Sequence, residues 1–176
     1  MKTQAFARKL QPNGKLPIRM GWAGGFQQFD IVGGPFDYFD EFSDSRSNSF
    51  GVCVRAEHAP TNLDLHLPIA DFDVPRNDAL TRETVRRTIA AALDGKDIYV
   101  GCQGGWGRTG LFLALIAKAT GEDDPVGYVR KHYSPRAVET PAQRAYVENF
   151  DVTSLQSDLF WRSWTKRWAD AIFWWR

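Results

Sequence analysis

Cysteine is scarce in this chain, with two among 176 residues, and so is any excess of charge, because the net charge is +1. Two cysteines cannot build the disulfide framework of a small secreted domain, so a reducing, cytoplasmic location is expected. A near-neutral chain has no overall field that attracts nucleic acid or an acidic membrane. Any preference for an anion must therefore come from a local site.

Long apolar segments are also missing. No uninterrupted apolar run approaches the ~20 residues that a membrane-spanning helix needs, and residues 1–14 have no apolar core of signal-peptide length. The hydrophobic fraction of 43% and the charged fraction of 24% are ordinary for a globular protein. The length suits one domain, and no internal repeat divides it.

The order of the predicted elements indicates an α/β fold. Residues 51–56 and 64–67 are predicted strands, and Val85, Ile89 and Leu93 recur at helical spacing in a predicted helix over 80–93. A strand that leads into Cys102 follows at once, which gives a parallel crossover unit. We expect a single domain with a central mixed or parallel sheet flanked by helices.

Helical signals dominate the second half of the chain. Residues 108–118 form one predicted helix, Pro125 opens another, and Thr140 with Gln143 has the capping-box spacing of a third. We divide the chain into an N-terminal extension packed on the domain (1–48), a core (49–150) and an amphipathic, Trp-rich C-terminal helix (151–176).

The central loop, residues 102–110, carries the chemistry. It places a thiol, Cys102, at the end of a strand and a guanidinium, Arg108, at the start of a helix. The residues between them are Gln103, Gly104, Gly105, Trp106 and Gly107. Successive amide N–H groups of such a glycine-rich turn can point into one concavity and bind a dianion at the helix N-terminus. The same field lowers the pKa of a thiol, and a thiolate below a phosphoryl group can attack it.

Two simpler interpretations compete with this one. A nucleotide-binding turn is disfavoured, because neither the Rossmann glycine spacing nor the Gly-Lys-Ser/Thr of a P-loop is present. A glycine-rich turn around a buried structural cysteine is the other alternative.

The central loop resembles the signature of the protein tyrosine phosphatase superfamily: Cys, five residues, Arg, Ser or Thr, Gly. Residues 67–75 are similar to the mobile loop that carries the general acid in dual-specificity members, and we call them the acid loop. Residues 136–143 are similar to the segment whose glutamine positions the hydrolytic water. The three segments occur in the order that the family has, between about residues 50 and 150.

The resemblance implies a role for each matched residue. Cys102 would be the nucleophile, Arg108 the phosphate clamp, and Thr109 a hydrogen-bond donor to the departing thiolate. Asp71 would be the general acid and then the base, and Gln143 would orient the water. Gln143 as a helix cap is the simpler alternative.

The identity of the general acid and the residue before the cysteine need separate comment. Asp73 competes with Asp71 as the acid, although the order Asp-Phe-Xaa-Val-Pro favours Asp71. The family usually has a histidine before the cysteine, which braces the loop, whereas this chain has Gly101. Either the loss of that brace raises the thiol pKa and slows turnover, or another group braces the loop. The glycine also admits a phosphate-binding module without catalysis.

The resemblance implies a metal-independent phosphomonoesterase without a cofactor, acting on phosphorylated tyrosine, serine or threonine in proteins. A phosphoinositide or RNA 5′-end phosphatase is an alternative. The central loop lacks the lysines that lipid-directed relatives often have, and the near-neutral charge argues against a nucleic-acid substrate. Trp106 either stacks on a substrate at the rim or packs under the loop.

Two further features leave alternatives open. Cys53 is either a buried strand residue or a redox partner that protects Cys102 by a reversible disulfide. Five tryptophans fall between residues 161 and 175, and most of them share one helical face. This face either packs on the core, or mediates self-association, or contacts a protein partner or a membrane surface.

Overall fold

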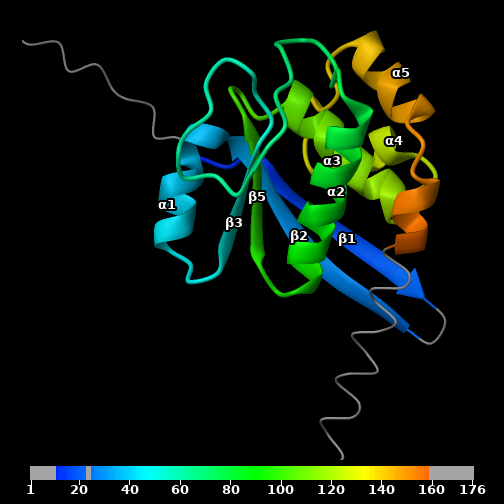
Figure 1. Ribbon diagram of the computed structural model, residues 1–176, viewed down its shortest axis with the longest axis horizontal. Coiled ribbons are helices and arrows are strands. Elements are labelled where there is room, and N and C mark those ends of the chain that lie inside the picture. Colours follow the sequence, from blue (N-terminus) through cyan, green and yellow to red (C-terminus); the bar gives the residue numbers. More distant parts are fainter. Residues whose placement is uncertain (1–10, 23–24, 159–176) are drawn as a thin grey trace, which may run out of the picture.

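The computed structural model describes residues 11–22 and 25–158 (Figure 1). Five strands form one sheet in the order β1-β2-β5-β3-β4. They are β1 (Gly14–Trp22), β2 (Gly25–Pro35), β3 (Ser49–Cys53), β4 (Leu65–His66) and β5 (Asp97–Cys102). The pair β1–β2 is antiparallel and the other pairs are parallel. The predicted mixed sheet is thus confirmed, with β5 at its centre.

The sheet begins earlier in the chain than the sequence-based division allows. The prediction sets residues 1–48 apart as an extension, whereas residues 14–35 supply two strands of the same sheet. In β1 the side chains of Leu16, Ile18 and Met20 alternate inward and are buried. The proline between the first two and the glycines of β2 weaken the alternating signal, which explains why the hairpin is hard to recognise.

Helices cover both faces of the sheet. They are η1 (Phe36–Tyr38), α1 (Phe39–Asp44), α2 (Asp78–Leu93), α3 (Gly107–Ala119), α4 (Pro125–His132) and α5 (Pro141–Asn149). Tyr99 packs with residues of α1 in one hydrophobic cluster, and its neighbour Val100 packs with residues of α2 and α3 in another. Because successive strand residues point to opposite faces, α1 covers one face and α2 and α3 the other.

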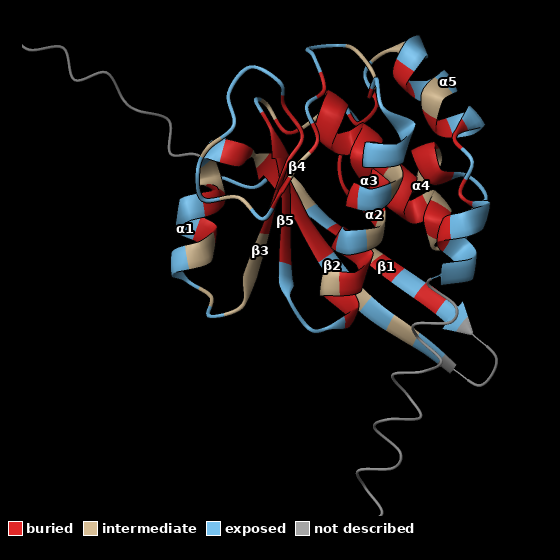
Figure 2. Cartoon of the chain, viewed as in Figure 1, coloured by how far each residue is buried: buried red, intermediate tan, exposed pale blue. Residues whose placement is uncertain are grey.

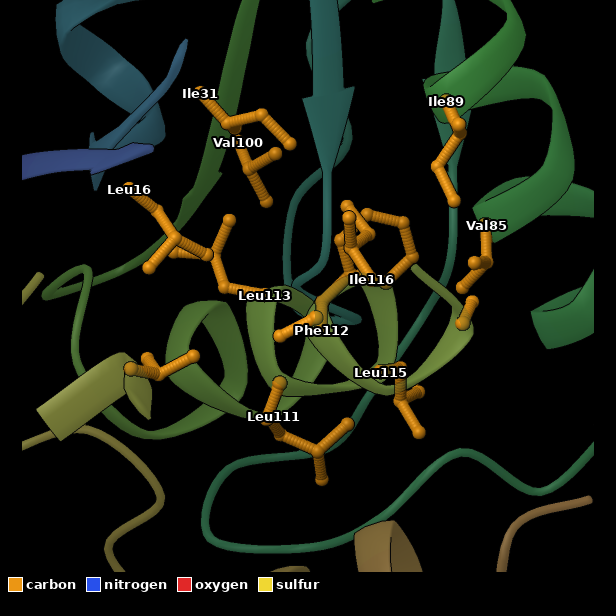
Figure 3. Packing of buried hydrophobic residues seen from close by; sticks show 14 of the residues in the cluster. Leu16, Ile31, Val85, Ile89, Val100, Leu111, Phe112, Leu113, Leu115 and Ile116 are labelled. Carbon is orange, nitrogen blue, oxygen red and sulfur yellow. The ribbon is translucent and has the colours of Figure 1, made fainter. Parts of the chain in front are cut away.

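Helix α3 lies in the middle of the main core. Its side chains from Leu111 to Ile116 are all fully buried (Figure 2), and Figure 3 shows Leu113 facing Leu16 of the sheet. A helix enclosed on all sides is apolar all round, as this one is. The first turn of α3 is therefore held rigidly, and with it the end of the central loop.

The starts of α4 and α5 follow the predicted capping chemistry, and α2 begins with a further cap that is not among the predictions. Asn77 caps α2 by accepting a hydrogen bond from the amide of Leu80, and Pro125 opens α4 after the cap residue Asp124. Thr140 and Gln143 form the predicted capping box of α5. These caps fix the entry points of the helices that surround the central loop.

The C-terminal prediction is largely untested. Residues 153–158 are helical, but the tryptophans between 161 and 175 lie outside the described residues. Within the described ranges, no helix has both the length and the apolar character to cross a membrane.

Candidate active site

The central loop leaves the sheet at the carboxyl end of β5, between the parallel strands β2 and β3. Open α/β sheets bind their ligands at this edge. Cys102 is the last residue of β5 and is 3% exposed. Its Sγ atom accepts a hydrogen bond of 3.2 Å from the amide of Gly105. One amide of the loop thus points at the sulfur, as the anion-binding interpretation requires.

Arg108 lies in the first turn of α3, is 3% exposed, and is fully engaged by its neighbours. Its Nη1 atom lies 2.6 Å from each carboxylate oxygen of Glu57 and donates at 3.1 Å to the carbonyl of Ile69. Its Nη2 atom lies 3.0 Å from Oδ1 of Asp71. The segment that follows β3 therefore holds the guanidinium on one side, and the acid loop holds it on the other.

Asp71 and Asp73 have different surroundings. Asp71 contacts Arg108 at the central loop, whereas Asp73 accepts a hydrogen bond from the amide of Val74 and pairs with Arg76 at 3.4 Å. The Val74 amide and the Arg76 guanidinium lower the pKa of the Asp73 carboxyl. Of the two candidates for the general acid, the structure brings only Asp71 into contact with the Arg108 guanidinium.

Glu57 is the site residue that sequence reasoning missed. Partial burial alone would raise the pKa of its carboxyl, but the hydrogen bonds from Arg108 outweigh this effect and the pKa is lowered. A signal was present in the sequence. Arg55 and Glu57 are charged residues that directly follow the buried strand β3, at the same sheet edge as Cys102. Strand ends at this edge commonly supply site residues.

Thr109 and Gln143 are both buried at the site. The hydroxyl of Thr109 has no hydrogen-bond partner in the described part of the chain. The side-chain oxygen of Gln143 accepts from the amide of Glu139 at 2.9 Å, and its nitrogen donates to the carbonyl of Asp73 at 3.2 Å. The capping role of Gln143 is confirmed, and the same side chain joins α5 to the acid loop.

The variable residues of the central loop have partners of their own. Gln103 accepts a hydrogen bond of 3.1 Å from Arg55, whose guanidinium is 2% exposed and pairs with Asp37 at 2.6 Å. Trp106 is half-buried, and the guanidinium of Arg136 lies over its ring at 4.1 Å. Trp106 is therefore partly covered by an exposed cation rather than lying free at the rim.

Gly101 occupies the position before the cysteine because no side chain fits there. A Cβ atom at this residue would lie 2.7 Å from Cα and 2.8 Å from N of Phe36. These are backbone atoms, which cannot rotate away as a side chain can. The backbone of η1 thus fills the place where the family resemblance implies a histidine.

Cys53 lies on the strand next to that of Cys102, but its side chain is on the other face of the sheet. It pairs with Gly101 of β5 and packs in the α1-side cluster, while Cys102 belongs to the cluster of α2 and α3. Burial raises the pKa of the Cys53 thiol. A disulfide between the two would require a strand end to move. The redox role of Cys53 stays a prediction.

The chain is similar to several known proteins. The family model described as "Polymorphic toxin system, DSP-PTPase phosphatase" matches residues 53–122. An uncharacterized protein of Methanocaldococcus jannaschii, MJECL20, is 34% identical over 127 residues, which cover 71% of this chain and 80% of that protein.

Solved structures with the same fold include two phosphatases. The active form of Tk-PTP is 22% identical, with a TM-score of 0.56 over 73% of this chain and 90% of that one. DUSP15 is 17% identical, with a TM-score of 0.59 over 72% of this chain and 86% of that one. At these identities the likeness shows the fold alone.

Proposed function

The chain belongs to the dual-specificity-like phosphatases of the protein tyrosine phosphatase superfamily, and we propose that it hydrolyses phosphomonoesters with Cys102 as the nucleophile. The observation that carries this proposal is the convergence of Cys102, Arg108 and Asp71 at one end of β5. Arg108 is oriented by Glu57 and Asp71, and the thiol accepts an amide hydrogen bond from the central loop. A thiol, an anion clamp and a carboxyl group are what phosphoryl transfer to sulfur requires.

The proposed reaction has two steps. In the first, the Cys102 thiolate attacks phosphorus, the bond from phosphorus to the leaving oxygen breaks, and Asp71 protonates that oxygen. In the second, Asp71 takes a proton from water, the resulting oxygen attacks phosphorus, and the bond from sulfur to phosphorus breaks. Inorganic phosphate is released and the thiolate is restored. The hydroxyl of Thr109 would donate a hydrogen bond to the departing sulfur.

The remaining site residues have supporting roles in this proposal. Arg108 binds two phosphoryl oxygens and stabilises the charge that develops on them. Gln143 holds the acid loop through the carbonyl of Asp73 and would orient the water of the second step. No step needs a metal ion or a cofactor.

We propose phosphorylated tyrosine, serine and threonine in proteins as the substrates. The alternatives are a phosphoinositide or an RNA 5′ end, and a phosphate-binding module that does not turn over. The last alternative rests on Gly101. The contacts of Arg108 with Asp71 argue against it, because a module that only binds phosphate has no need of a carboxylate at the clamp.

The decisive experiment compares the full chain with Cys102→Ser in the hydrolysis of p-nitrophenyl phosphate, with a chelator present. We expect turnover in the wild type and none above background in Cys102→Ser, while the variant still binds tungstate. Cys53→Ser is the matched control, because that thiol lies on the other face of the sheet, and it should keep most of the activity. Equal rates for the wild type and Cys102→Ser would refute the proposal, as would the absence of turnover in both.

A role in a polymorphic toxin system is a second candidate, favoured by the description of the matched family model. It adds a biological setting to the same chemistry, since a toxic phosphatase must act on phosphate esters of the target cell. Induced expression of the wild type would then slow growth of a bacterial host, and Cys102→Ser would not. Equal growth with both chains would count against the toxin role and would leave the enzymatic proposal unchanged.

A further inference from the structure

Two carbonyl groups of the central loop are each held by a side chain from outside the loop. The side-chain nitrogen of Asn13 donates to the carbonyl of Gly104 at 2.9 Å. The hydroxyl of Tyr133 donates to the carbonyl of Gly105. Asn13 precedes β1, and Tyr133 follows the last turn of α4. Elements from both halves of the chain therefore meet at this loop.

The first of these hydrogen bonds is linked to the thiol through one peptide unit. The carbonyl of Gly104 and the amide of Gly105 belong to the same planar peptide, in which C=O and N–H point in opposite directions. Asn13 holds the carbonyl end, and the amide end donates to Sγ of Cys102 at 3.2 Å. As long as Asn13 binds the carbonyl, this peptide cannot rotate its amide away from the sulfur.

The same reasoning applies to the next peptide. Tyr133 holds the carbonyl of Gly105, so the amide of Trp106 in that peptide is directed away from Tyr133. Gly105 has φ of +79°, a conformation open to glycine at little cost, so this point of the loop is easily rotated without external support. Asn13 and Tyr133 therefore hold the loop at the point where its backbone rotates most easily.

The fold makes room for Tyr133 with glycines. A Cβ atom at Gly33 would lie 2.8 Å from the ring of Tyr133, and one at Gly14 would lie 2.7 Å from its carbonyl oxygen. Gly14 and Gly33 are paired in the register of β1 and β2. The amide of Asn13 also donates to the carbonyl of Gly33 at 2.7 Å, so the backbone that carries the Asn13 side chain is anchored.

We propose that Asn13 and Tyr133 are positioning residues that fix the amides of the central loop toward the sulfur and the phosphate, in place of the histidine that Gly101 excludes. This role rests on the proposed function, because it concerns the same anion site. Both residues act through the peptides of the loop and neither would touch the substrate. Hydrogen bonds at the carbonyl also polarise the peptide and strengthen its amide as a donor.

Ionisable groups outside the loop also lie near Cys102. The Cys53 thiol on β3 and the hydroxyls of Tyr99 and Tyr133 each interact electrostatically with it. Burial raises the pKa of all three, so they are neutral near pH 7. The loop cation Arg108 is paired with Glu57 and Asp71. The orientation of the amides is therefore the main local influence that Asn13 and Tyr133 can control.

The test measures the pKa of the Cys102 thiol in the full chain by its rate of alkylation with iodoacetamide across pH. Mass spectrometry of the peptides separates Cys102 from Cys53. In Tyr133→Phe and in Asn13→Ala we expect the thiol pKa to rise by about one unit, so alkylation below the pKa slows about tenfold. The kcat for an aryl phosphate at acidic pH should fall by a similar factor, with a smaller change in KM.

Tyr128→Phe is the matched control. Its hydroxyl comes from the same helix, α4, and donates to the carbonyl of Pro17 on β1 at 2.7 Å, away from the central loop. Tyr128→Phe and Tyr133→Phe each lose a hydrogen bond to a backbone carbonyl, and Tyr133→Phe also loses its contact with the Asn13 side chain. Both melting temperatures should therefore fall. Only Tyr133→Phe should change the alkylation profile, which a merely stabilising role would leave unchanged.

The outcomes separate this proposal from the proposed function. A wild-type alkylation profile in both Asn13→Ala and Tyr133→Phe overturns the positioning role even if the enzyme turns over. A shifted profile in the variants, with no turnover in the wild type, supports the positioning role and rejects the phosphatase. If Tyr133→Phe does not fold, Asn13→Ala decides alone, because Asn13 is only half-buried at the edge of the sheet.

Discussion

The carboxylate of Asp71 lies against the guanidinium of Arg108, with 3.0 Å between Oδ1 and Nη2. This ion pair joins the acid loop to the first turn of α3 and places a carboxyl group beside the residue expected to bind phosphate. Asp73, two residues away, contacts Val74 and Arg76 instead. Phe72 lies between the two aspartates with φ of 58°. This backbone conformation turns the loop, so the two carboxylates reach different partners.

The first prediction concerns the identity of the acid. Asp71→Asn should lower kcat/KM for phenyl phosphate by about 10²-fold, because a phenolate leaving group needs a proton. The loss should be smaller for p-nitrophenyl phosphate, whose leaving group departs readily without one. Asp73→Asn is the control and should stay within a few-fold of the wild type on both substrates. Equal losses for the two variants, or a loss independent of the leaving group, would contradict the assignment.

The second prediction concerns Glu57, which holds one nitrogen of Arg108 at 2.6 Å from each carboxylate oxygen. Glu57→Gln keeps the size of the side chain but removes the charge and one acceptor, so Arg108 loses its orientation. Vanadate should bind about tenfold more weakly, since hydrogen bonds to charged groups contribute about 1.5–3 kcal/mol each. Isothermal titration would measure this.

Glu83→Gln provides the control for that experiment. Glu83 also pairs with an arginine through both carboxylate oxygens, which accept from Nε and Nη2 of Arg86 at 2.8 and 2.7 Å on the surface of α2. Its loss removes an exposed carboxylate–arginine pair that does not involve Arg108, so vanadate affinity should not change. If Glu83→Gln weakened binding as much as Glu57→Gln, a general loss of charge or stability would explain both, and Glu57 would have no special role.

The third prediction concerns pH. The pKa of Glu57 is lower in the folded protein than its ordinary value of 4.5, because the hydrogen bonds from Arg108 outweigh the opposing effect of burial. A carboxyl group with a depressed pKa contributes stability above its unfolded pKa and loses it as pH falls through the folded pKa. The stabilising effect of Glu57 is thus fully present at neutral pH and disappears in acid. The difference in unfolding free energy between the wild type and Glu57→Gln should shrink as the pH falls from neutral through the ordinary pKa of a glutamate and further into acid. A difference that stays constant over this range would show that the Arg108 pair does not titrate with folding.

The fourth prediction concerns the glycine before the nucleophile. Gly101→Ala places a Cβ atom 2.7 Å from Cα of Phe36 and 2.9 Å from the carbonyl oxygen of Gly34. Backbone atoms must shift to relieve this, which should cost about 1–3 kcal/mol of unfolding free energy in urea titrations. Gly21→Ala is the control, because nothing lies within 4 Å of its added Cβ. Gly101→His, which would restore the usual family residue, should fail to fold rather than gain activity.

How much of this could be predicted depends on how local each signal is. Helices α2 and α3 and the capping box at Thr140 have their determinants within a few residues, and the sequence predicts them closely. The central loop is recognisable because Cys102 and Arg108 occur at the spacing of a known signature. These features do not depend on which distant segment packs against them.

The remainder depends on tertiary contacts that no local pattern reports. Gly33 resembles a turn residue in the sequence, but it lies within β2. The ring of Tyr133 occupies the space that a Cβ atom at this position would need. Asn13 precedes a strand that itself is hard to recognise, and its partner Gly104 is 91 positions away. Glu57 follows a strand as any loop residue could, and only the fold brings it to Arg108.

The last prediction concerns oxidation, where the sheet separates two thiols that the sequence allows to pair. Cys53 packs among the aromatic residues of the α1 side and Cys102 faces the α3 side, so their sulfurs point away from each other across the sheet. Mild peroxide should therefore inactivate the wild type without forming a disulfide between residues 53 and 102, and non-reducing peptide mass spectrometry would show this directly. Cys53→Ser should lose activity to peroxide at the same rate as the wild type and recover to the same extent with dithiothreitol. Faster irreversible loss in Cys53→Ser, together with a 53–102 linkage in the wild type, would show that the end of β5 moves enough to cross the sheet and that Cys53 protects the nucleophile.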